Sequence, residues 1–154
     1  MARPRLLDLF CCAGGAAMGY HRAFPEAEIV GVDIEYRGNY PFEFIQGDAL
    51  EYVANGARRF DFIHASPPCQ ASCNLTKGTN KGREYRQLIP ATRALLEATG
   101  LPYVIENVQG SDLRRDLTLC GEMLGRDVIR HRYFACSSPV EQPPPPPQRG
   151  RVRG

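Results

Sequence analysis

Short apolar segments alternate with stretches of helical character along most of this chain. Strands are predicted at residues 5–10, 28–34, 42–48, 60–66, 102–108 and 128–136. Helices are predicted from the glycine-rich turn to about Phe24, at residues 49–56 and at residues 84–99, the last of them kinked or interrupted at Pro90. The stretch 110–125 follows no regular pattern. Such an alternation is typical of βαβ units, so we predict an α/β fold with a mostly parallel sheet and flanking helices.

The composition predicts one folded domain followed by a tail. With 43% apolar and 23% charged residues, 154 residues suffice for a single globular domain, which we assign to residues 1–136. Residues 137–154 contain five successive prolines and three arginines, which predicts a proline-rich, basic, disordered tail. The net charge of +2 neither requires nor excludes a nucleic-acid partner. No segment approaches the roughly 20 apolar residues of a membrane span and the first residues lack a signal peptide's apolar segment, so we expect a cytoplasmic protein.

One of the six cysteines stands out from the others by its surroundings. Cys69 directly follows Ser66, Pro67 and Pro68, which end an apolar run and stiffen the backbone. The alternative is a rigid loop that carries a core cysteine, because most of these cysteines suit small apolar packing positions in a reduced setting. Cys73 is only four residues away from Cys69 and no second pair has metal-site spacing, so no metal is predicted.

Polar or glycine residues recur where the predicted parallel strands end. They are Gly14 with Gly15, Asp33, Asp48, Cys69 and Glu106. Because ligands of open parallel sheets bind beyond the carboxyl ends of the strands, these positions predict a single cleft.

The glycine turn of this predicted cleft favours a nucleoside ligand. Its glycines run G-G-x-x-x-G, which is not the G-x-G-x-x-G pattern of dinucleotide sites. An acidic residue 19 positions after Gly14, at Asp33, suits hydrogen bonds to ribose hydroxyls, and Asp48 can accept from an adenine amino group. S-adenosylmethionine fits this pattern, and on the pattern alone a nicotinamide cofactor stays open.

Six segments, in this order, resemble the motifs of the DNA cytosine-5 methyltransferases. They are DLFCCAGGAAMGY, VDIE, GDA, SPPCQ, IENV and RHRYF. The resemblance extends from residue 5 to about residue 135. It implies a Rossmann-like, S-adenosylmethionine-dependent methyltransferase fold and an enzyme that methylates C5 of cytosine in DNA.

The resemblance also implies catalytic roles for four residues, Cys69, Glu106, Arg130 and Arg132. Cys69 would add as a thiolate to C6 of the base, which makes C5 nucleophilic enough to accept a methyl group. Glu106 would hold a proton toward N3 and accept from the 4-amino group, although a strand-end cap or ion pair is the alternative. Arg130 and Arg132 would hold the base and its phosphate, with a solvated strand edge as the alternative. His64 and His131 are interpreted as packing residues.

A second set of residues is implied to bind S-adenosylmethionine. Phe10 would stack on the adenine, residues 13–15 would contact the methionine part, and Asp33 would bind the ribose. The complete predicted cofactor set is Phe10, Ala13, Gly14, Gly15, Asp33, Ile34, Asp48, Ala49 and Pro68.

Family members carry a recognition domain after the arginine motif, whereas about twenty residues follow it here. Three hypotheses therefore stay open. The chain is a minimal DNA methyltransferase of a phage or restriction-modification kind, with Lys77, Lys81 and the tail contacting the DNA backbone. In the second hypothesis the chain methylates single-stranded nucleic acid or a free cytosine nucleotide. In the third it is an inactive relative that binds S-adenosylmethionine or a partner chain. A partner chain or a second copy of this chain could also supply the recognition region. The joint presence of Cys69, Gln70 and Glu106 favours an enzyme.

Overall fold

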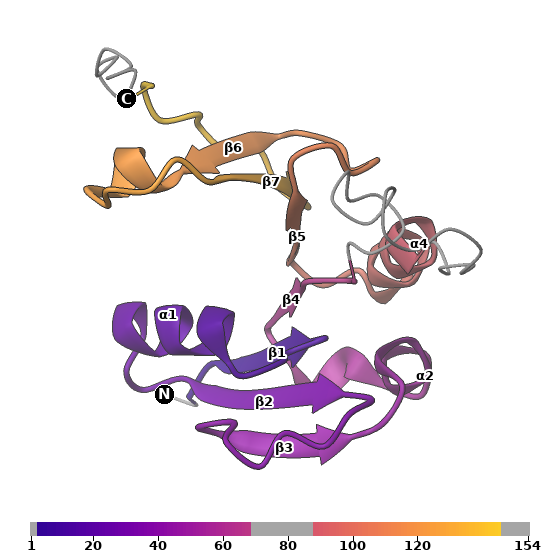
Figure 1. The fold of residues 1–154 in the computed structure, drawn as a ribbon. Helices are drawn as coiled ribbons and strands as arrows, with labels where there is room; N and C mark the ends of the chain where they lie inside the picture. The colour runs from indigo at the N-terminus through magenta and orange to yellow at the C-terminus, as the bar shows by residue number, and fades with distance from the viewer. Residues whose placement is uncertain (1–2, 69–87, 146–154) are drawn as a thin grey trace, which may run out of the picture.

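The computed structural model describes residues 3–68 and 88–145 of the chain. In these residues one sheet of seven strands has the order β3-β2-β1-β4-β5-β7-β6 (Figure 1). The parallel strands are β1 (Arg5–Leu9), β2 (Glu28–Asp33), β3 (Glu43–Gln46), β4 (Phe62–Ala65) and β5 (Tyr103–Val108). Two antiparallel strands, β7 (His131–Cys136) and β6 (Leu117–Cys120), extend the sheet beyond β5. The prediction of a mostly parallel, Rossmann-like α/β sheet is confirmed.

Helices lie on both faces of this sheet (Figure 1). They are α1 (Gly15–Ala23), α2 (Ala49–Ala54) and α4 (Leu88–Thr99), with 3-10 turns η1 (Ala57–Arg59) and η2 (Gly121–Leu124). Helices α2 and α4 contribute Val53, Ile89 and Leu96 to one core cluster, and α1 contributes Ala17 to a second. Each face is therefore covered where its helix packs, as expected for a parallel sheet.

Alternation along the strands assigns each side chain to one face. In β1, Leu7 and Leu9 belong to the core under α2 and α4, whereas Leu6 belongs to the core under α1. Asp8, between Leu7 and Leu9, therefore faces α1 and is only 1% exposed. Polar side chains on alternate positions of these strands consequently collect on the α1 face.

The predicted elements differ from the observed ones in two places. The stretch 110–125 was predicted to be irregular, but it contains β6 and η2, because β6 pairs with β7 from Leu117 to Cys120. The last strand begins at His131, not at residue 128. Residues 84–87 of the helix predicted at 84–99 lie outside the described residues, so the kink or interruption at Pro90, which lies in the described part α4, stays a prediction.

The segment after β7 follows the sheet edge for some distance. Gln142 brackets the backbone of Thr118 in β6: it accepts from the Thr118 N–H at 2.8 Å and donates to the Thr118 carbonyl at 2.9 Å. Residues 146–154 of the predicted tail lie outside the described residues. No helix in the described ranges is long and apolar enough to cross a membrane.

Candidate functional site

The turn between β1 and α1 has an unusual backbone. Phe10 and Cys12 have positive φ angles, 56° and 49°, a conformation that costs energy for residues other than glycine and that clusters at functional sites. Gly14 follows with φ 84°, and a Cβ there would lie 2.7 Å from Cδ of Pro41, so only glycine fits. At Gly15, by contrast, a Cβ would meet no atom within 4 Å. The turn thus opens the first residues of α1 to a ligand.

Asp33 connects this turn to the end of β2. One carboxylate oxygen accepts from the backbone N–H of Cys12 at 2.9 Å, and the other accepts from that of Glu35 at 3.0 Å. Arg37 lies 3.8 Å from the second oxygen. Each carboxylate oxygen has two lone pairs, so Asp33 keeps acceptor capacity for a ribose. Ile34, the next residue, is 68% exposed and offers an apolar surface beside it.

The remaining predicted cofactor residues lie at the same edge of the sheet. Oδ1 of Asp48 caps α2 by accepting from the N–H groups of Leu50 and Glu51, at 2.8 and 3.0 Å. Ala49 is buried in the first turn of α2, while Ala13 and Pro68 are exposed. The adenine role proposed for Asp48 stays a prediction, as do the other cofactor contacts.

Cys69 and Gln70 lie outside the described residues, as do Lys77 and Lys81, but the backbone that leads to them is well anchored. The N–H of Ser66 donates to the Leu9 carbonyl at 3.1 Å. The side-chain amide of Asn107, which is 2% exposed, donates to the Pro67 carbonyl at 2.9 Å. The chain therefore leaves the sheet at a position held from both neighbouring strands.

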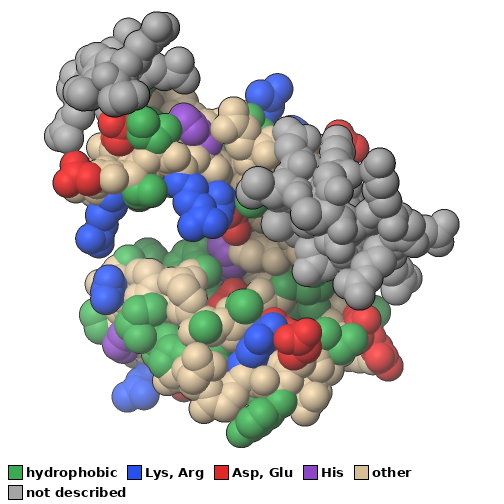
Figure 2. Space-filling view, viewed as in Figure 1, with side chains coloured by type: hydrophobic (Ala, Val, Ile, Leu, Met, Phe, Trp, Pro, Cys, Tyr) green, Lys and Arg blue, Asp and Glu red, His purple; other side chains and the backbone are tan. Residues whose placement is uncertain are grey.

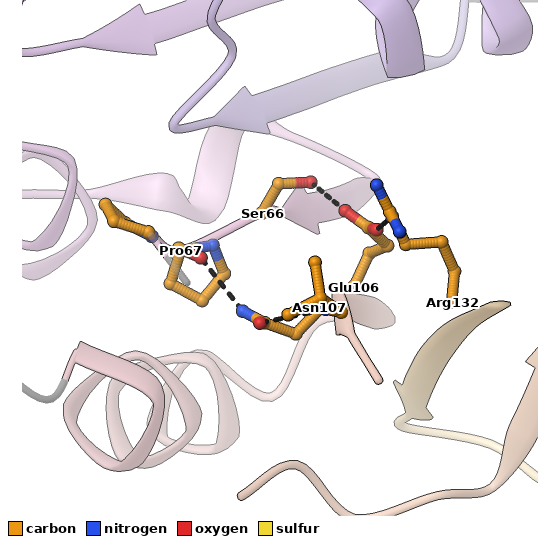
Figure 3. A pocket seen from close by; sticks show the side chains of 7 residues that line it. Ser66, Pro67, Glu106, Asn107 and Arg132 are labelled. Atoms are coloured by element: carbon orange, nitrogen blue, oxygen red, sulfur yellow. Dashed lines mark hydrogen bonds and ion pairs between the residues drawn. The ribbon is translucent and has the colours of Figure 1, made fainter. Parts of the chain in front are cut away.

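Glu106 and Arg132 form an ion pair next to this anchor. Nε of Arg132 lies 2.7 Å from Oε1 of Glu106, and Oγ of Ser66 donates to Oε2 at 3.0 Å (Figure 3). Glu106 was predicted to follow its strand but lies within β5, opposite Phe134 of β7, and Arg132 lies opposite Val108. The structure thus joins two predicted catalytic residues. Arg130 is exposed just before β7 and is not part of this ion pair.

Two openings meet at Glu106. A pocket of about 210 Å³ is lined by Ser66, Pro67, Pro68, Glu106, Asn107, Val108 and Arg132 (Figure 3). A larger cleft of about 610 Å³ lies between α1 and the strands β5 and β7, and Glu106 and His64 are in its wall. Figure 2 shows the hollow on this side of the molecule, with Arg side chains on its rim. Glu106 can therefore be approached from solvent although it belongs to the sheet.

Two buried ionisable groups, Asp8 and His64, lie behind this site on the α1 face. Burial raises the pKa of Asp8 to about 7, and the Tyr40 hydroxyl donates to its carboxylate at 3.2 Å. Burial lowers the pKa of His64 to about 4, so its ring is neutral at neutral pH. Nδ1 of His64 lies 3.0 Å from the hydroxyl of Tyr20, and Nε2 lies 2.9 Å from Oγ of Ser66.

Sequence reasoning missed the polar contacts of Tyr20, His64, Ser66 and Asn107. The spacing of His64 and Ser66 offered a signal, because residues two apart at the end of a strand share one face. Tyr20 and Asn107 carried no comparable signal. In the described residues no group of three or more His, Cys, Asp or Glu side chains could hold a metal ion.

Comparison with known proteins adds a family match. The model of the C-5 cytosine-specific DNA methylase family matches residues 4–117. The type II methyltransferase M.XorII of Xanthomonas oryzae pv. oryzae is 27% identical in an alignment of 149 residues that covers 84% of this chain and 35% of that protein. The chain thus spans about a third of the length of this curated relative.

Two solved structures of methyltransferases are also similar. One is a SAM-dependent methyltransferase from Archaeoglobus fulgidus, with 18% identity, a TM-score of 0.49 and coverage of 73% of this chain and 48% of that chain. The other is the MycE methyltransferase from the mycinamycin biosynthetic pathway in complex with Mg and SAH, with 22% identity, a TM-score of 0.47 and coverage of 80% and 30%.

Proposed function

The chain belongs to the C-5 cytosine-specific DNA methylase family, and we propose that it transfers a methyl group from S-adenosylmethionine to C5 of cytosine in DNA. One observation carries the proposal: Glu106 is held by Arg132 and Ser66 beside the anchored backbone that leads to Cys69. A carboxyl group and a thiol are what addition to a pyrimidine needs, since the carboxyl group interacts with the N3 side of the ring and the thiolate attacks C6.

S-adenosylmethionine is the cofactor of this family, and the strand ends offer suitable contacts for it. The carboxylate of Asp33 would accept from the ribose hydroxyls, the open turn at Gly14 and Gly15 would admit the methionine part, and Ile34 and Phe10 would contact the adenine. The bound cofactor supplies an electrophilic methyl group.

The chain's own residues activate the base. The Cys69 thiolate forms a bond to C6, and the electron pair of the C5–C6 double bond moves into the ring toward N3. Glu106 shares a proton with N3, which neutralises this charge, and Arg132 keeps the carboxyl group in place. After C5 has accepted the methyl group it loses its proton to a base, and the C6–S bond breaks to release Cys69 as a thiolate.

Cys69→Ser tests this mechanism most directly. The variant should lose transfer of labelled methyl groups to DNA while binding S-adenosylmethionine with unchanged affinity. Cys73→Ser is the matched control, since it removes a thiol only four residues further along the sequence and should leave transfer intact. DNA that contains 5-fluorocytosine should trap a covalent adduct with the wild type and with Cys73→Ser, and an adduct that persists in Cys69→Ser would refute the assignment.

The substrate is tested in the same assay. Methyl transfer to duplex DNA supports the proposal as stated, and transfer only to single strands or to a cytosine nucleotide would replace it by the corresponding substrate. Binding of S-adenosylmethionine without transfer to any of them would point to a relative that depends on another chain.

A further inference from the structure

A row of hydrogen bonds connects helix α1 to Glu106 across the face of the sheet. It runs from the hydroxyl of Tyr20 to Nδ1 of His64, from Nε2 of His64 to Oγ of Ser66, and from Ser66 to Oε2 of Glu106. The three distances are 3.0, 2.9 and 3.0 Å. The participating residues come from α1, β4, the residue after β4, and β5.

The chemistry of these groups sets the direction of every bond. Ser66 has one hydroxyl hydrogen, and its carboxylate neighbour can only accept, so Ser66 donates to Glu106. Oγ of Ser66 must then accept from His64, which places the ring hydrogen on Nε2. A neutral ring with its hydrogen on Nε2 has an acceptor at Nδ1, so the hydroxyl of Tyr20 donates to it.

Burial supports the protonation states that this direction requires. His64 is 4% exposed, and its lowered pKa of about 4 keeps the ring neutral. Burial also raises the pKa of Tyr20, so this hydroxyl keeps its hydrogen. The rings of Tyr20 and His64 meet edge to face with centroids 5.4 Å apart, which fixes the orientation of the imidazole.

We propose that Tyr20, His64 and Ser66 are positioning residues for Glu106. Because every hydrogen bond of the row donates in the direction of Glu106, Oε2 acts as an acceptor, and the exchangeable proton of the carboxyl group is carried by Oε1. A proton on Oε2 would make Ser66 accept from the carboxyl group as well as from His64, and the Ser66 hydroxyl hydrogen would then lose its acceptor in the row. Oε1, by contrast, faces Arg132, and both side chains line the 210 Å³ pocket in which the base would bind. The inference deepens the proposed function, on which the catalytic meaning of Oε1 rests.

Other ionisable groups lie next to this row and affect its electrostatics. Asp8 of β1 is the register partner of His64, Arg132 of β7 contacts Glu106, and Tyr40 bonds to Asp8. Variants of the row are therefore compared in one background, in which these three groups are unchanged.

The hydrogen position is tested first, by NMR of ¹⁵N-labelled histidine, with His64→Gln used to assign the signal. The expected result at pH 7 is a neutral ring that carries its hydrogen on Nε2. A ring with its hydrogen on Nδ1, or a charged ring at this pH, would overturn the direction of the row. This readout does not depend on methyl transfer, so it holds even if the proposed function fails.

The positioning role is tested by Ser66→Ala and its conservative counterpart Ser66→Thr. Ser66→Ala removes the donor to Oε2, so in ¹³C-labelled protein at pH 7 the side-chain carboxyl signal of Glu106 should move away from its wild-type chemical shift. In the methyl-transfer assay kcat should fall about tenfold, the loss expected for one hydrogen bond to a charged group, with KM for S-adenosylmethionine unchanged. Ser66→Thr keeps the hydroxyl and should restore both readouts.

Matched controls separate this effect from general destabilisation. Ser137→Ala removes a hydroxyl that accepts from the Tyr103 N–H elsewhere in the sheet, and Tyr52→Phe removes a hydroxyl on α2 that accepts from Arg59. Both should leave the Glu106 carboxyl signal at its wild-type chemical shift, whereas Tyr20→Phe should move it in the same direction as Ser66→Ala, by less. An unchanged Glu106 carboxyl signal in Ser66→Ala would refute the positioning role, and it would do so independently of whether Cys69→Ser abolishes transfer.

Discussion

Replacing Asp8 by asparagine should change how the stability of this protein depends on pH. Asp8 lies in the middle of β1, is 1% exposed and accepts one hydrogen bond from Tyr40. Burial raises its pKa from the ordinary value of 3.8 to about 7, and the nearby charge of Asp33 adds to this rise. Between these two pH values the folded protein holds a proton on Asp8 that the unfolded chain has released. The contribution of Asp8 to the free energy of unfolding is therefore greatest below pH 3.8 and is lost as the pH rises toward 7.

The magnitude follows from the size of the shift. A difference of about three pKa units at about 1.4 kcal/mol each corresponds to roughly 4 kcal/mol of unfolding free energy, which is a large part of what a domain of this size has. Asparagine has nearly the same shape and no charge to bury, so Asp8→Asn should not show this loss. The free energy of unfolding of the wild type minus that of Asp8→Asn should thus fall by about 4 kcal/mol between pH 4 and pH 8.

Urea unfolding of both proteins across this pH range measures the difference. His64 titrates in the opposite sense, since its lowered pKa of about 4 makes stability fall as the pH drops below its ordinary value of 6.5. This contribution is common to both proteins and cancels in the difference. Tyr40→Phe removes the side-chain donor that lowers the pKa of Asp8, so the loss of stability should become larger and continue to a higher pH. A wild-type-minus-variant difference that stays constant from pH 4 to pH 8 would refute the burial argument.

Two further substitutions test other parts of the structure. Gly14→Ala should destabilise the protein by about 1–2 kcal/mol, because alanine is strained at φ 84° and its Cβ would lie 2.7 Å from Pro41. The variant should also bind S-adenosylmethionine more weakly in calorimetry. Equal stability of Gly14→Ala and the wild type in thermal unfolding would contradict this reasoning. Asp116→Asn should lower the free energy of unfolding by about 1 kcal/mol at pH 7, a small value because the ion pair is exposed to solvent. Hydrogen bonds from Arg114 lower the pKa of Asp116, and they stabilise the folded protein until the pH drops through that lowered pKa. The deficit in urea unfolding should vanish at acid pH, and a deficit of the same size there would refute the ion-pair explanation.

The parallel part of the sheet could be predicted because its strands are buried on both faces. Continuous apolar runs such as residues 28–34 and 102–108 have few other uses in a chain of this size, and each one forms a strand at nearly the predicted place. The glycine turn and Asp33 could be predicted for a related reason. They lie where parallel strands end, and the carboxyl ends of all such strands meet at one edge.

The antiparallel edge could not be predicted in the same way. Strand β6 has four residues, of which only Cys120 is buried, so its sequence shows no alternation strong enough to stand out from a loop. Its strand conformation depends on hydrogen bonds to β7, and Gln142 adds contacts to Thr118 from beyond β7. Long-range pairing of this kind leaves no local signal.

The ion pair of Glu106 with Arg132 lies between these two cases. The residues could be identified by family resemblance, but their contact depends on the register of β5 against β7, which pairs Glu106 with Phe134 and Val108 with Arg132. A shift of this register by one residue would turn Arg132 to the opposite face of the sheet. The geometry of this ion pair therefore depends on the antiparallel edge of the sheet, which was the part predicted least well from the sequence.

The polar groups of the site share one face of the sheet, and this arrangement limits what the fold can tolerate. Asp8, His64 and Glu106 all point to the α1 side, whereas the opposite face at β1 and β4 is built from Leu7, Leu9, Ile63 and Ala65. Each of the three polar groups has a partner, since an unpaired buried polar group costs about 1–3 kcal/mol. Helix α1 supplies one of these partners through Tyr20, and its glycine-rich start opens toward the cleft. A substitution in α1 that moves Tyr20 should therefore disturb Glu106 before it unfolds the sheet. A small displacement is enough to break a hydrogen bond of the row, whereas the apolar contacts between the strands and helices tolerate it.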